Sequence, residues 1–321
     1  MKKTLITRGE NWYKANLHCH STLSDGRRTV EELAEAYRRE GYQIVAFSDH
    51  RKLIPHPELK REDFLPLTSV ELDGSDYREE DTKYRSTYHL NFFAKNETDT
   101  NLDFFDHQAA RKNYGPEVWN SLIAAVSERF LVQYNHPRWS MQDIRDFGPL
   151  EGLWSFEVFN TGCEKEHFNG WGEEEYIQML RSGKHLIPTA TDDNHNASPF
   201  DHPKSDSFGG VTMIGAEALE YSAVIAAMEQ GNCYATTGPL IKELWVEDGV
   251  LTVETSPCCG VLLRTPGYRA MPEWSHADDL TRVQFTLDPE KMKHPEYLYL
   301  EVVDTHGKKA ITRAFLAEEW M

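Results

Sequence analysis

Metal-ligating side chains recur in this chain directly after short apolar segments, and the first of them are two histidines one residue apart. His18 and His20 lie in the stretch Asn16-Leu17-His18-Cys19-His20-Ser21-Thr22-Leu23-Ser24-Asp25-Gly26, which follows a short strand-like segment. Side chains i and i+2 of a strand point to the same face, so both imidazoles can reach one point. Neutral imidazole is a good ligand for zinc, iron, copper and nickel. An isolated pair of this kind could equally be two partly exposed histidines beside a buried Cys19.

The residues after this pair predict a helix and a second strand. Thr29 can cap the helix, Glu32 can complete a capping box, and Gly41 is a good C-terminal stop. Residues 43–47 are then nearly all apolar, which is typical of a strand covered on both faces. This strand ends in Ser48-Asp49-His50, so candidate ligands follow both strands of the first unit.

The same alternation continues through the first two thirds of the chain. Strand-like segments cover residues 64–70, 88–93, 130–134, 154–159 and 185–190, and helical periodicity covers residues 116–129, 173–182 and 216–230. Alternating strands and helices predict a parallel sheet, and polar residues at strand ends favour a closed β/α barrel, whose catalytic groups lie at that face. An open doubly wound sheet is the alternative, but it uses fewer strand ends, and the chain has no glycine-rich dinucleotide-binding fingerprint.

Beyond residue 240 the pattern changes to short alternating runs. These runs cover residues 241–246, 250–255, 261–264, 282–287, 297–303 and 309–315. Asp248-Gly249 is a strong hairpin signal between the first two. We therefore predict an α/β domain over residues 1–240 and a small all-β C-terminal module over residues 241–321.

Charge and cysteine content limit the partners and the compartment. Lys and Arg number 34 against 52 Asp and Glu, a net charge of −18, which repels nucleic acid and anionic membranes over most of the surface. A small anionic substrate is still compatible, because bound divalent cations reverse the local sign. The five cysteines form no CxxC pair, and no apolar run is long enough to span a bilayer or act as a signal peptide. We expect a cytoplasmic protein that binds neither nucleic acid nor membranes.

The scattered histidines and carboxylates are best explained as one multinuclear metal site. The nine candidate ligands are His18, His20, Asp25, His50, Glu71, His89, His136, Asp193 and His195. Six histidines and three carboxylates at one barrel mouth would be costly without cations, because unpaired buried charge is heavily penalised. At roughly four ligands per zinc, nine ligands with a bridging carboxylate can hold two or three divalent ions.

The order of these elements resembles one enzyme family. His-x-His, Ser-Asp-Gly, Asp-His, Glu, His, Asn-His-Pro and Asp-x-His follow one another from His18 to His195, as in the PHP (polymerase and histidinol phosphatase) domain family. The segments Asp206-Ser207-Phe208-Gly209-Gly210 and Tyr234-Ala235-Thr236-Thr237-Gly238-Pro239 resemble the stand-alone metallohydrolases related to CehA and McbA. The resemblance implies a distorted, TIM-like (β/α)7 barrel with a multinuclear metal site and a C-terminal β appendage.

Transferred position by position, the family pattern implies three groups of ligands. The first contains His18, His20, Glu71 and Asp193; the second uses Glu71 as a bridge with His89 and His136; the third contains Asp25, His50 and His195. Some members of the family have histidine where this chain has Asp25. An oxygen ligand at this position makes manganese or iron plausible beside zinc.

These residues lead us to expect a metal-dependent hydrolase. Among hydrolases, a phosphoesterase is the preferred interpretation. Bridged ions would supply hydroxide near neutral pH for attack on a small phosphorylated molecule. Arg51 and Arg138 directly follow ligand elements and are candidate phosphate clamps, with surface salt bridges as the alternative. Asp49, Asp192 and Glu157 are candidates for orienting imidazoles or protonating the leaving group, with hydrogen-bonded strand-end carboxylates as the alternative.

Two other functions remain open from the sequence. The same metals could hydrolyse a carboxyl ester or a carbamate, as the CehA-like resemblance allows. A non-catalytic, metal-stabilised binding module is the other alternative, although none of the expected ligands is missing. The sequence identifies neither the substrate nor the native metal, and it gives no oligomeric state.

Overall fold

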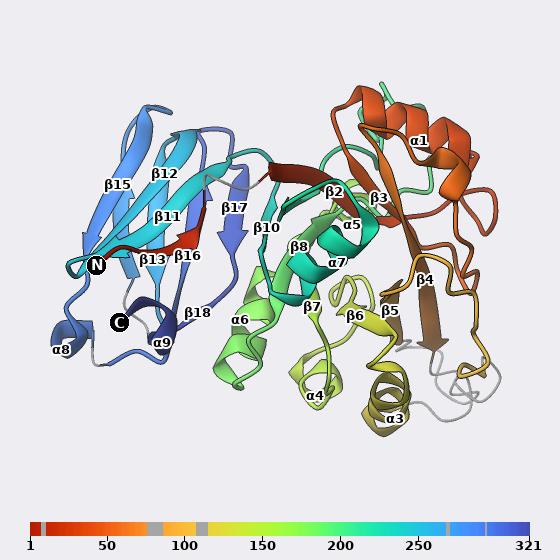
Figure 1. Ribbon diagram of the computed structural model, residues 1–321, viewed down its shortest axis with the longest axis horizontal. Coiled ribbons are helices and arrows are strands. Elements are labelled where there is room, and N and C mark those ends of the chain that lie inside the picture. Colours follow the sequence, from red (N-terminus) through yellow and green to blue (C-terminus); the bar gives the residue numbers. More distant parts are fainter. Residues whose placement is uncertain (8–10, 76–85, 107–114, 268–269, 293) are drawn as a thin grey trace.

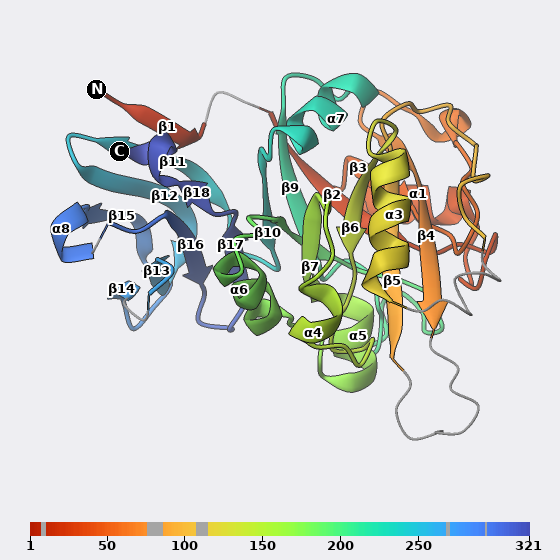
Figure 2. The same cartoon turned by 90° about the horizontal axis from the view of Figure 1, so that it is seen from below.

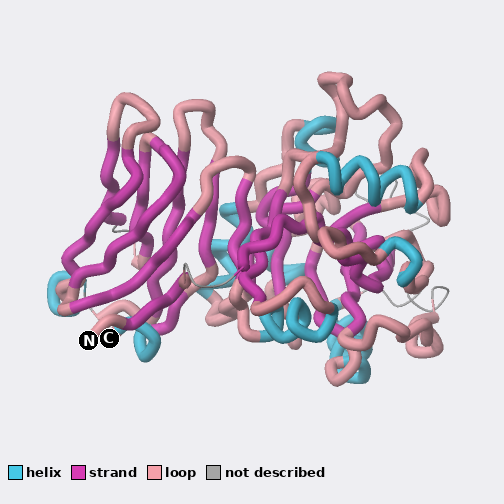
Figure 3. Tube along the Cα trace, turned by 45° about the horizontal axis from the view of Figure 1, so that its top comes forward, coloured by secondary structure: helices cyan, strands magenta, loops and turns pink. Residues whose placement is uncertain are grey.

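The computed structural model describes residues 1–7, 11–75, 86–106, 115–267, 270–292 and 294–321. A large part made of strands and helices lies beside a smaller part made almost entirely of strands (Figure 1). The two chain ends meet on the smaller part, where Nζ of Lys3 donates a hydrogen bond to the carbonyl oxygen of Met321 at 2.6 Å (Figure 3).

In the described residues, nine strands and several helices make up the larger part. The strands are β2 (Asn11–Cys19), β3 (Ile44–Phe47), β4 (Leu65–Ser75), β5 (Thr87–Ala94), β6 (Phe130–Tyr134), β7 (Ser155–Asn160), β8 (Ile187–Thr191), β9 (Val211–Ala216) and β10 (Cys233–Thr236). The described helices are α1 (Val30–Arg39), η1 (Pro57–Leu59), α3 (Pro116–Val126), α4 (Ile144–Phe147), α5 (Thr161–His167), α6 (Glu173–Arg181) and α7 (Tyr221–Glu229).

The sheet of this part is mixed rather than parallel throughout. Its strand order is β10-β9-β2-β3-β4-β5-β6-β7-β8. Strands β2, β3 and β4 are parallel to one another, as are β6, β7 and β8, whereas β5 is antiparallel to β4 and β6, and β9 to β2. The link between β4 and β5, residues 76–86, is shorter than the dozen or so residues that a parallel crossover requires. The expectation of a wholly parallel sheet is therefore wrong at β5 and β9.

The two ends of the curled sheet approach each other at the rim that carries the histidines. The Asp193 N–H donates to the His18 carbonyl at 2.9 Å, and the His20 N–H donates to the Asn194 carbonyl at 3.2 Å. Deeper in, the Thr212 hydroxyl donates to the Ala190 carbonyl at 3.1 Å. No ladder joins β8 to β2 within the described ranges, so the closed seven-stranded barrel stays a prediction.

Local sequence signals predicted one helix correctly and another only in part. Helix α1 begins with the predicted capping box of Thr29 and Glu32, and it buries Val30, Leu33, Ala34 and Tyr37 on one face. The predicted helix over residues 216–230 is only partly right. Residues 211–216 form the fully buried strand β9, and α7 begins at Tyr221.

The C-terminal part contains the predicted strands and two that were not predicted. Its strands are β11 (Ile241–Glu247), β12 (Val250–Cys258), β13 (Gly260–Arg264), β14 (Ala270–Trp274), β15 (Leu280–Thr286), β16 (Tyr297–Val303), β17 (Lys309–Thr312) and β18 (Phe315–Leu316), with short helices α8 (Pro289–Met292) and α9 (Ala317–Trp320). Asp248 and Gly249 have φ of 49° and 75°, as a tight hairpin turn requires. Leu244, Leu251 and Leu263 are buried in an apolar cluster that also includes Leu33 and Phe47 of the larger part. Figure 2 shows the strands of the C-terminal part beside the larger part.

The N-terminal strand pairs with a strand of the C-terminal part. Strand β1 (Lys3–Ile6) pairs antiparallel with β11, so residues 3–6 complete the sheet β1-β11-β12-β15 of the C-terminal part. The other C-terminal sheet continues into the larger part, because β17 pairs with β10. The division of the chain into two domains itself stays a prediction.

The state of the cysteines and the length of the helices can be compared with the expectations from composition. All five cysteines are buried free thiols. None of the helices in the described ranges combines the length and the apolar character that crossing a bilayer demands.

Candidate metal centre

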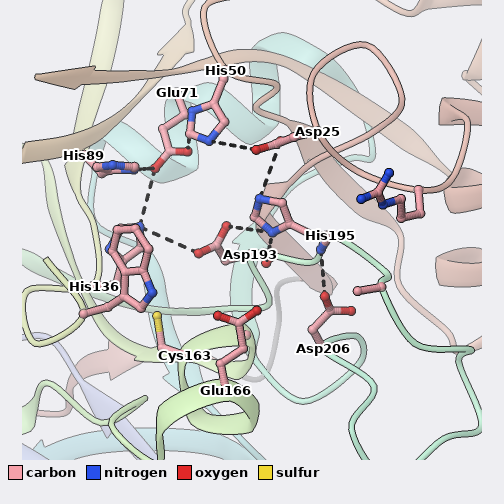
Figure 4. Close-up of a pocket in the computed structure, with 14 residues that line it drawn as sticks. Asp25, His50, Glu71, His89, His136, Cys163, Glu166, Asp193, His195 and Asp206 are labelled. Atoms are coloured by element: carbon pink, nitrogen blue, oxygen red, sulfur yellow. Dashed lines mark hydrogen bonds and ion pairs between the residues drawn. The ribbon is translucent and has the colours of Figure 1, made fainter.

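A cavity of about 340 Å³ opens at the rim where the histidine-bearing strand ends meet (Figure 4). This volume lies within the range of small-molecule sites. Its lining consists of Asp25, Arg27, His50, Glu71, His89, His136, Trp139, Gly162, Cys163, Glu166, Asp193, His195, Ala197 and Asp206. His18 and His20 are fully buried behind this lining. The structure therefore brings all nine candidate ligands to one place.

Glu71, on β4, lies at the centre of the cluster and is almost fully buried. Its carboxylate oxygens lie close to five imidazole nitrogens: Nδ1 of His89 at 2.8 Å, Nε2 of His20 and Nδ1 of His50 at 3.2 Å, Nε2 of His18 at 3.4 Å and Nε2 of His136 at 3.5 Å. One carboxylate thus reaches ligands from four different strand ends, as a bridging ligand must.

Asp193 completes the first ligand group from the opposite end of the sheet. Its Oδ1 lies 3.1 Å from Nε2 of His20 and 3.2 Å from Nε2 of His18. Its backbone has φ of 51°, an uncommon conformation for a residue other than glycine, which turns the chain between Asp192 and Asn194. His18, His20, Glu71 and Asp193 present ligand atoms that all lie within 4.8 Å of one another.

Asp25 gathers a further group at the outer side of the cavity. Its carboxylate lies 3.5 Å from Nε2 of His195 and 3.6 Å from both Nε2 of His50 and Nδ1 of His20. The predicted group of Asp25, His50 and His195 is thus assembled, with His20 beside it.

The remaining predicted group is arranged differently from the family pattern. His89 and His136 both approach Oε1 of Glu71, but the compact sets are His50 with Glu71 and His89, and His18 with His136 and Glu157. The sequence had predicted His50 for the third group and His18 for the first.

The chemistry of these side chains fits divalent cations. Nε2 of His18, both ring nitrogens of His20 and Nδ1 of His50 are buried and make no hydrogen bond. Buried polar atoms without a partner are rare in folded proteins, because their desolvation is not compensated. All four atoms face carboxylate oxygens, and a mixed set of imidazole and carboxylate ligands suits zinc, manganese or iron.

The cluster also stabilises positive charge electrostatically. Burial lowers the pKa of His20, but the nearby carboxylates of Asp193 and Glu71 outweigh burial and raise this pKa to about 10. Burial alone would raise the pKa of Glu71 and of Asp193, yet the surrounding imidazoles hold both well below their usual range. A bound cation would take over the positive charge that protons otherwise supply.

We expect metal binding to release protons. His18, His20 and His136 have raised pKa values, because nearby carboxylates overcome the effect of burial, and an imidazole must lose its proton before it binds a metal. The affinity of the chelator-treated protein for Zn²⁺ should therefore rise with pH between about 6 and 9. Titration calorimetry in buffers of different ionisation enthalpy measures the protons released. Binding that is independent of buffer and pH would contradict this assignment.

Residues around the cluster fix the orientation of its ligands. Glu157, on β7, lies 3.1 Å from Nδ1 of His18, so the other ring nitrogen of His18 faces Glu71 and Asp193. The Asn135 amide donates to Glu71 at 3.0 Å, and the Asn160 amide donates to Asp193 at 3.1 Å. The proposed role of Glu157 in orienting an imidazole agrees with this geometry.

Asp49 and Asp192 accept hydrogen bonds from other residues of the fold. Asp49 accepts hydrogen bonds from the backbone and hydroxyl groups of Ser21 and Ser24, which fold the loop before Asp25. Asp192 is fully buried and likewise accepts hydrogen bonds only from groups of the fold. Neither residue lines the cavity. The hydrogen-bonded strand-end carboxylate, considered as the alternative for each, is the arrangement that the structure contains, and a catalytic role for either residue stays a prediction.

Arg51 and Arg138 are also placed away from the cavity lining. Arg51 pairs with Asp73 at 2.6 Å, and Nε of Arg138 pairs with Glu175 at 2.9 Å. The surface salt bridge, considered as the alternative for each, is the arrangement that the structure contains.

Several lining residues were missed from the sequence. Arg27 directly follows Asp25-Gly26, which is the same signal that had pointed to Arg51 and Arg138. Cys163 and Glu166 lie on α5, whose first turn is capped by the Asn160 side chain. That capping residue after the strand over residues 154–159 is the signal that would have revealed the helix.

The model of the PHP domain family matches residues 16–145. Among curated proteins, the DNA polymerase/3'-5' exonuclease PolX of Bacillus subtilis is 46% identical over 41 residues, which are 13% of this chain and 7% of that protein. The DNA polymerase III subunit alpha of Campylobacter jejuni is 26% identical over 209 residues, 56% of this chain and 17% of that protein. The chain thus spans only a small fraction of these relatives.

Two solved structures are similar to the whole chain or to part of it. A two-domain protein of Bacteroides vulgatus, named for a predicted PHP-like metal-dependent phosphoesterase, has a TM-score of 0.49 and 15% identity and covers 97% of both chains. A proposed metal-dependent phosphoesterase of Bifidobacterium adolescentis has a TM-score of 0.38 and 16% identity, and covers 56% of this chain and 87% of that one. At these values the likeness supports no conclusion about activity.

The family match covers the segment that contributes His18, Asp25, Glu71 and His136 to the cluster. The resemblance inferred from the order of the histidine and carboxylate motifs is therefore confirmed by the match of residues 16–145 to the PHP domain family.

Proposed function

We propose that this protein is a metal-dependent phosphoesterase that hydrolyses a small phosphorylated molecule. The observation that carries the proposal is the set of buried imidazole nitrogens without hydrogen-bond partners around Glu71 and Asp193, at the base of a cavity open to solvent. The match of residues 16–145 to the PHP domain family is compatible with the same class of reaction.

Two or three divalent ions would be held by the three ligand groups that the family resemblance implies. His18, His20, Glu71 and Asp193 would hold one, Glu71 with His89 and His136 a second, and Asp25, His50 and His195 a third. Bound zinc, manganese or iron would lower the pKa of a water molecule and neutralise charge on the phosphoryl oxygens.

The protein's own residues would arrange the reacting groups. In the hydrolysis, the oxygen of water bonds to phosphorus, the ester P–O bond breaks, and a proton from the water ends on the departing oxygen. Glu157, Asn135 and Asn160 hold the ligand side chains in fixed orientations, so little reorganisation is needed when charge develops. Trp139 packs edge-on against His89 and His136, at 5.4 and 5.1 Å between ring centroids, and forms part of the wall.

The size and charge of the cavity favour a small molecule over a polymer. A volume of about 340 Å³ accommodates a small phosphate ester, and the net charge of −18 opposes nucleic acid outside the site. The polymerase and exonuclease activities belong to relatives of which the chain covers at most 17%, and we do not extend them to this protein.

A panel of esters with one common leaving group tests the proposal. Protein loaded with Zn²⁺, Mn²⁺ or Fe²⁺ should hydrolyse p-nitrophenyl phosphate or its methyl diester, and a chelator should abolish the activity. Cleavage of p-nitrophenyl acetate or a p-nitrophenyl carbamate without any cleavage of the phosphate esters would favour the carboxyl-ester or carbamate alternative. A folded, metal-bound protein that hydrolyses none of them would favour the binding module.

A further inference from the structure

The cavity wall contains one permanent positive charge that the cluster does not use. Among the described residues that line the cavity, Arg27 is the single arginine, and there is no lysine. Its guanidinium forms no ion pair and no hydrogen bond with any other residue that the structure describes. Arg51 and Arg138, by contrast, are paired with Asp73 and Glu175.

The backbone of Arg27 is fixed beside the candidate ligands. Its N–H donates to the His195 carbonyl at 2.9 Å, and the carbonyl of the next residue, Arg28, accepts from Thr22 at 2.9 Å. Gly26 lies so close to His20 that a Cβ there would be 2.5 Å from the His20 carbonyl oxygen. The segment with Gly26 and Arg27 therefore lies directly against the backbone of His20. The Cα of Arg27 is held in a defined position next to Asp25, at the edge of the cavity.

The local charge explains why an unpaired arginine matters here. Asp25, Glu166 and Asp206 also line the cavity, so its wall would repel an anion wherever bound cations do not compensate. A guanidinium is permanently charged and donates paired, parallel hydrogen bonds that match phosphate oxygens. Among the described lining residues, Arg27 is the one that can donate such paired hydrogen bonds, and it forms no ion pair with a carboxylate.

We propose that Arg27 binds the phosphoryl oxygens that the metal ions leave free and thereby selects substrates whose phosphate carries two negative charges. This inference rests on the proposed function, because it names the substrate class of the same site. It replaces the expectation that Arg51 or Arg138 has this role. Phosphate monoesters are largely dianionic above a pKa of about 6, diesters carry one charge, and carboxyl esters carry none.

The test compares Arg27→Gln with Arg28→Gln in metal-loaded protein. Arg28 is the matched control because it is the adjacent arginine, lies 3.8 Å from Glu32 and 5.5 Å from the Phe200 ring, and does not line the cavity. Substrates are p-nitrophenyl phosphate, methyl p-nitrophenyl phosphate and p-nitrophenyl acetate, which share a leaving group and differ in charge. Isothermal titration with inorganic phosphate provides a readout that does not depend on turnover.

We expect Arg27→Gln to lower kcat/KM by about 10- to 100-fold for the monoester, by less for the diester and by under about twofold for any acetate hydrolysis. The Kd for phosphate should rise about tenfold or more, while Arg28→Gln changes neither quantity by more than about twofold. Arg27→Lys should recover part of the loss, because it keeps the charge but not the paired geometry.

Two outcomes would overturn the role of Arg27. One is an unchanged Kd for phosphate in Arg27→Gln, and the other is an equal loss of kcat/KM for charged and neutral esters. A wild-type protein that cleaves no phosphate ester contradicts the proposed function instead, and the phosphate titration then still decides whether Arg27 binds the anion.

Discussion

Replacing Glu71 by glutamine should remove most of the bound metal and lower kcat/KM for phosphate esters by at least about 1000-fold. Substitutions that only orient a metal ligand typically cost 10- to 100-fold, and Glu71 contacts the candidate ligands directly. Its carboxylate lies within 3.5 Å of nitrogens from five histidines, so no other single side chain of the cluster touches as many partners. Glutamine keeps the size but removes the negative charge, and its amide hydrogens would face the imidazoles.

The same change at a surface glutamate provides the control. Glu35 lies on α1 at the surface, where its ion pairs with described residues are those with Arg38 and Arg39. Glu35→Gln should keep the metal content and the activity of the wild type within about twofold, as surface substitutions usually do. Elemental analysis and kcat/KM are measured for both variants. Full metal content and near-normal activity in Glu71→Gln would show that Glu71 does not bridge ions.

The second large effect is on stability, at Asp192. Asp192→Ala should lower the free energy of unfolding of the chelator-treated protein by at least about 3 kcal/mol. The carboxylate is fully buried and accepts five hydrogen bonds, from the Tyr37 and Thr161 hydroxyls and from the backbone N–H groups of residues 208, 209 and 210. Each buried donor left without a partner costs about 1–3 kcal/mol.

Urea unfolding measures this effect, and Asp201→Ala is its control. Asp201 lies in the same loop region, is exposed, and makes no hydrogen bond or ion pair with any described residue. Its replacement should change stability by no more than about 0.5 kcal/mol. A stable Asp192→Ala protein that binds metal normally but has lost kcat would contradict the positioning role and restore the acid or base role inferred from the sequence.

The gathering of the ligands could be predicted because it follows from strand geometry. His50 and Asp193 each come after a strand of the parallel sets, and such strands end at one edge of the sheet. His89 reaches the same edge for a different reason. It lies near the start of β5, and the antiparallel pairing of β5 with β4 places it opposite Asp73, close to Glu71. The position of His89 near Glu71 was therefore predicted correctly, although the direction of β5 was not.

The partners of the charged side chains could not be predicted, because they depend on contacts distant in sequence. Arg51, Arg138 and Arg27 each follow a ligand element, and nothing local distinguishes them. Arg51 is paired with a residue of β4, and Arg138 with a residue of α6. Arg27 has no such partner among the described residues. The hydrogen bonds that Asp49 and Asp192 accept could not be predicted for the same reason, since their donors come from other segments.

Strands β1 and β9 could not be predicted from local sequence patterns either. Residues 3–6 join β11, more than two hundred positions away, and no local pattern announces that pairing. Strand β9 is buried on both faces, so it lacks the alternation that identifies a half-exposed strand.

Anomalous X-ray scattering from crystals of protein purified without added metal would test the central claim most directly. Data recorded on both sides of the zinc, iron and manganese absorption edges should show a peak between His18, His20, Glu71 and Asp193, and at least one more peak near His89 and His136 or near Asp25 and His195. The absence of any peak within this cluster, even after soaking with all three metals, would contradict the account.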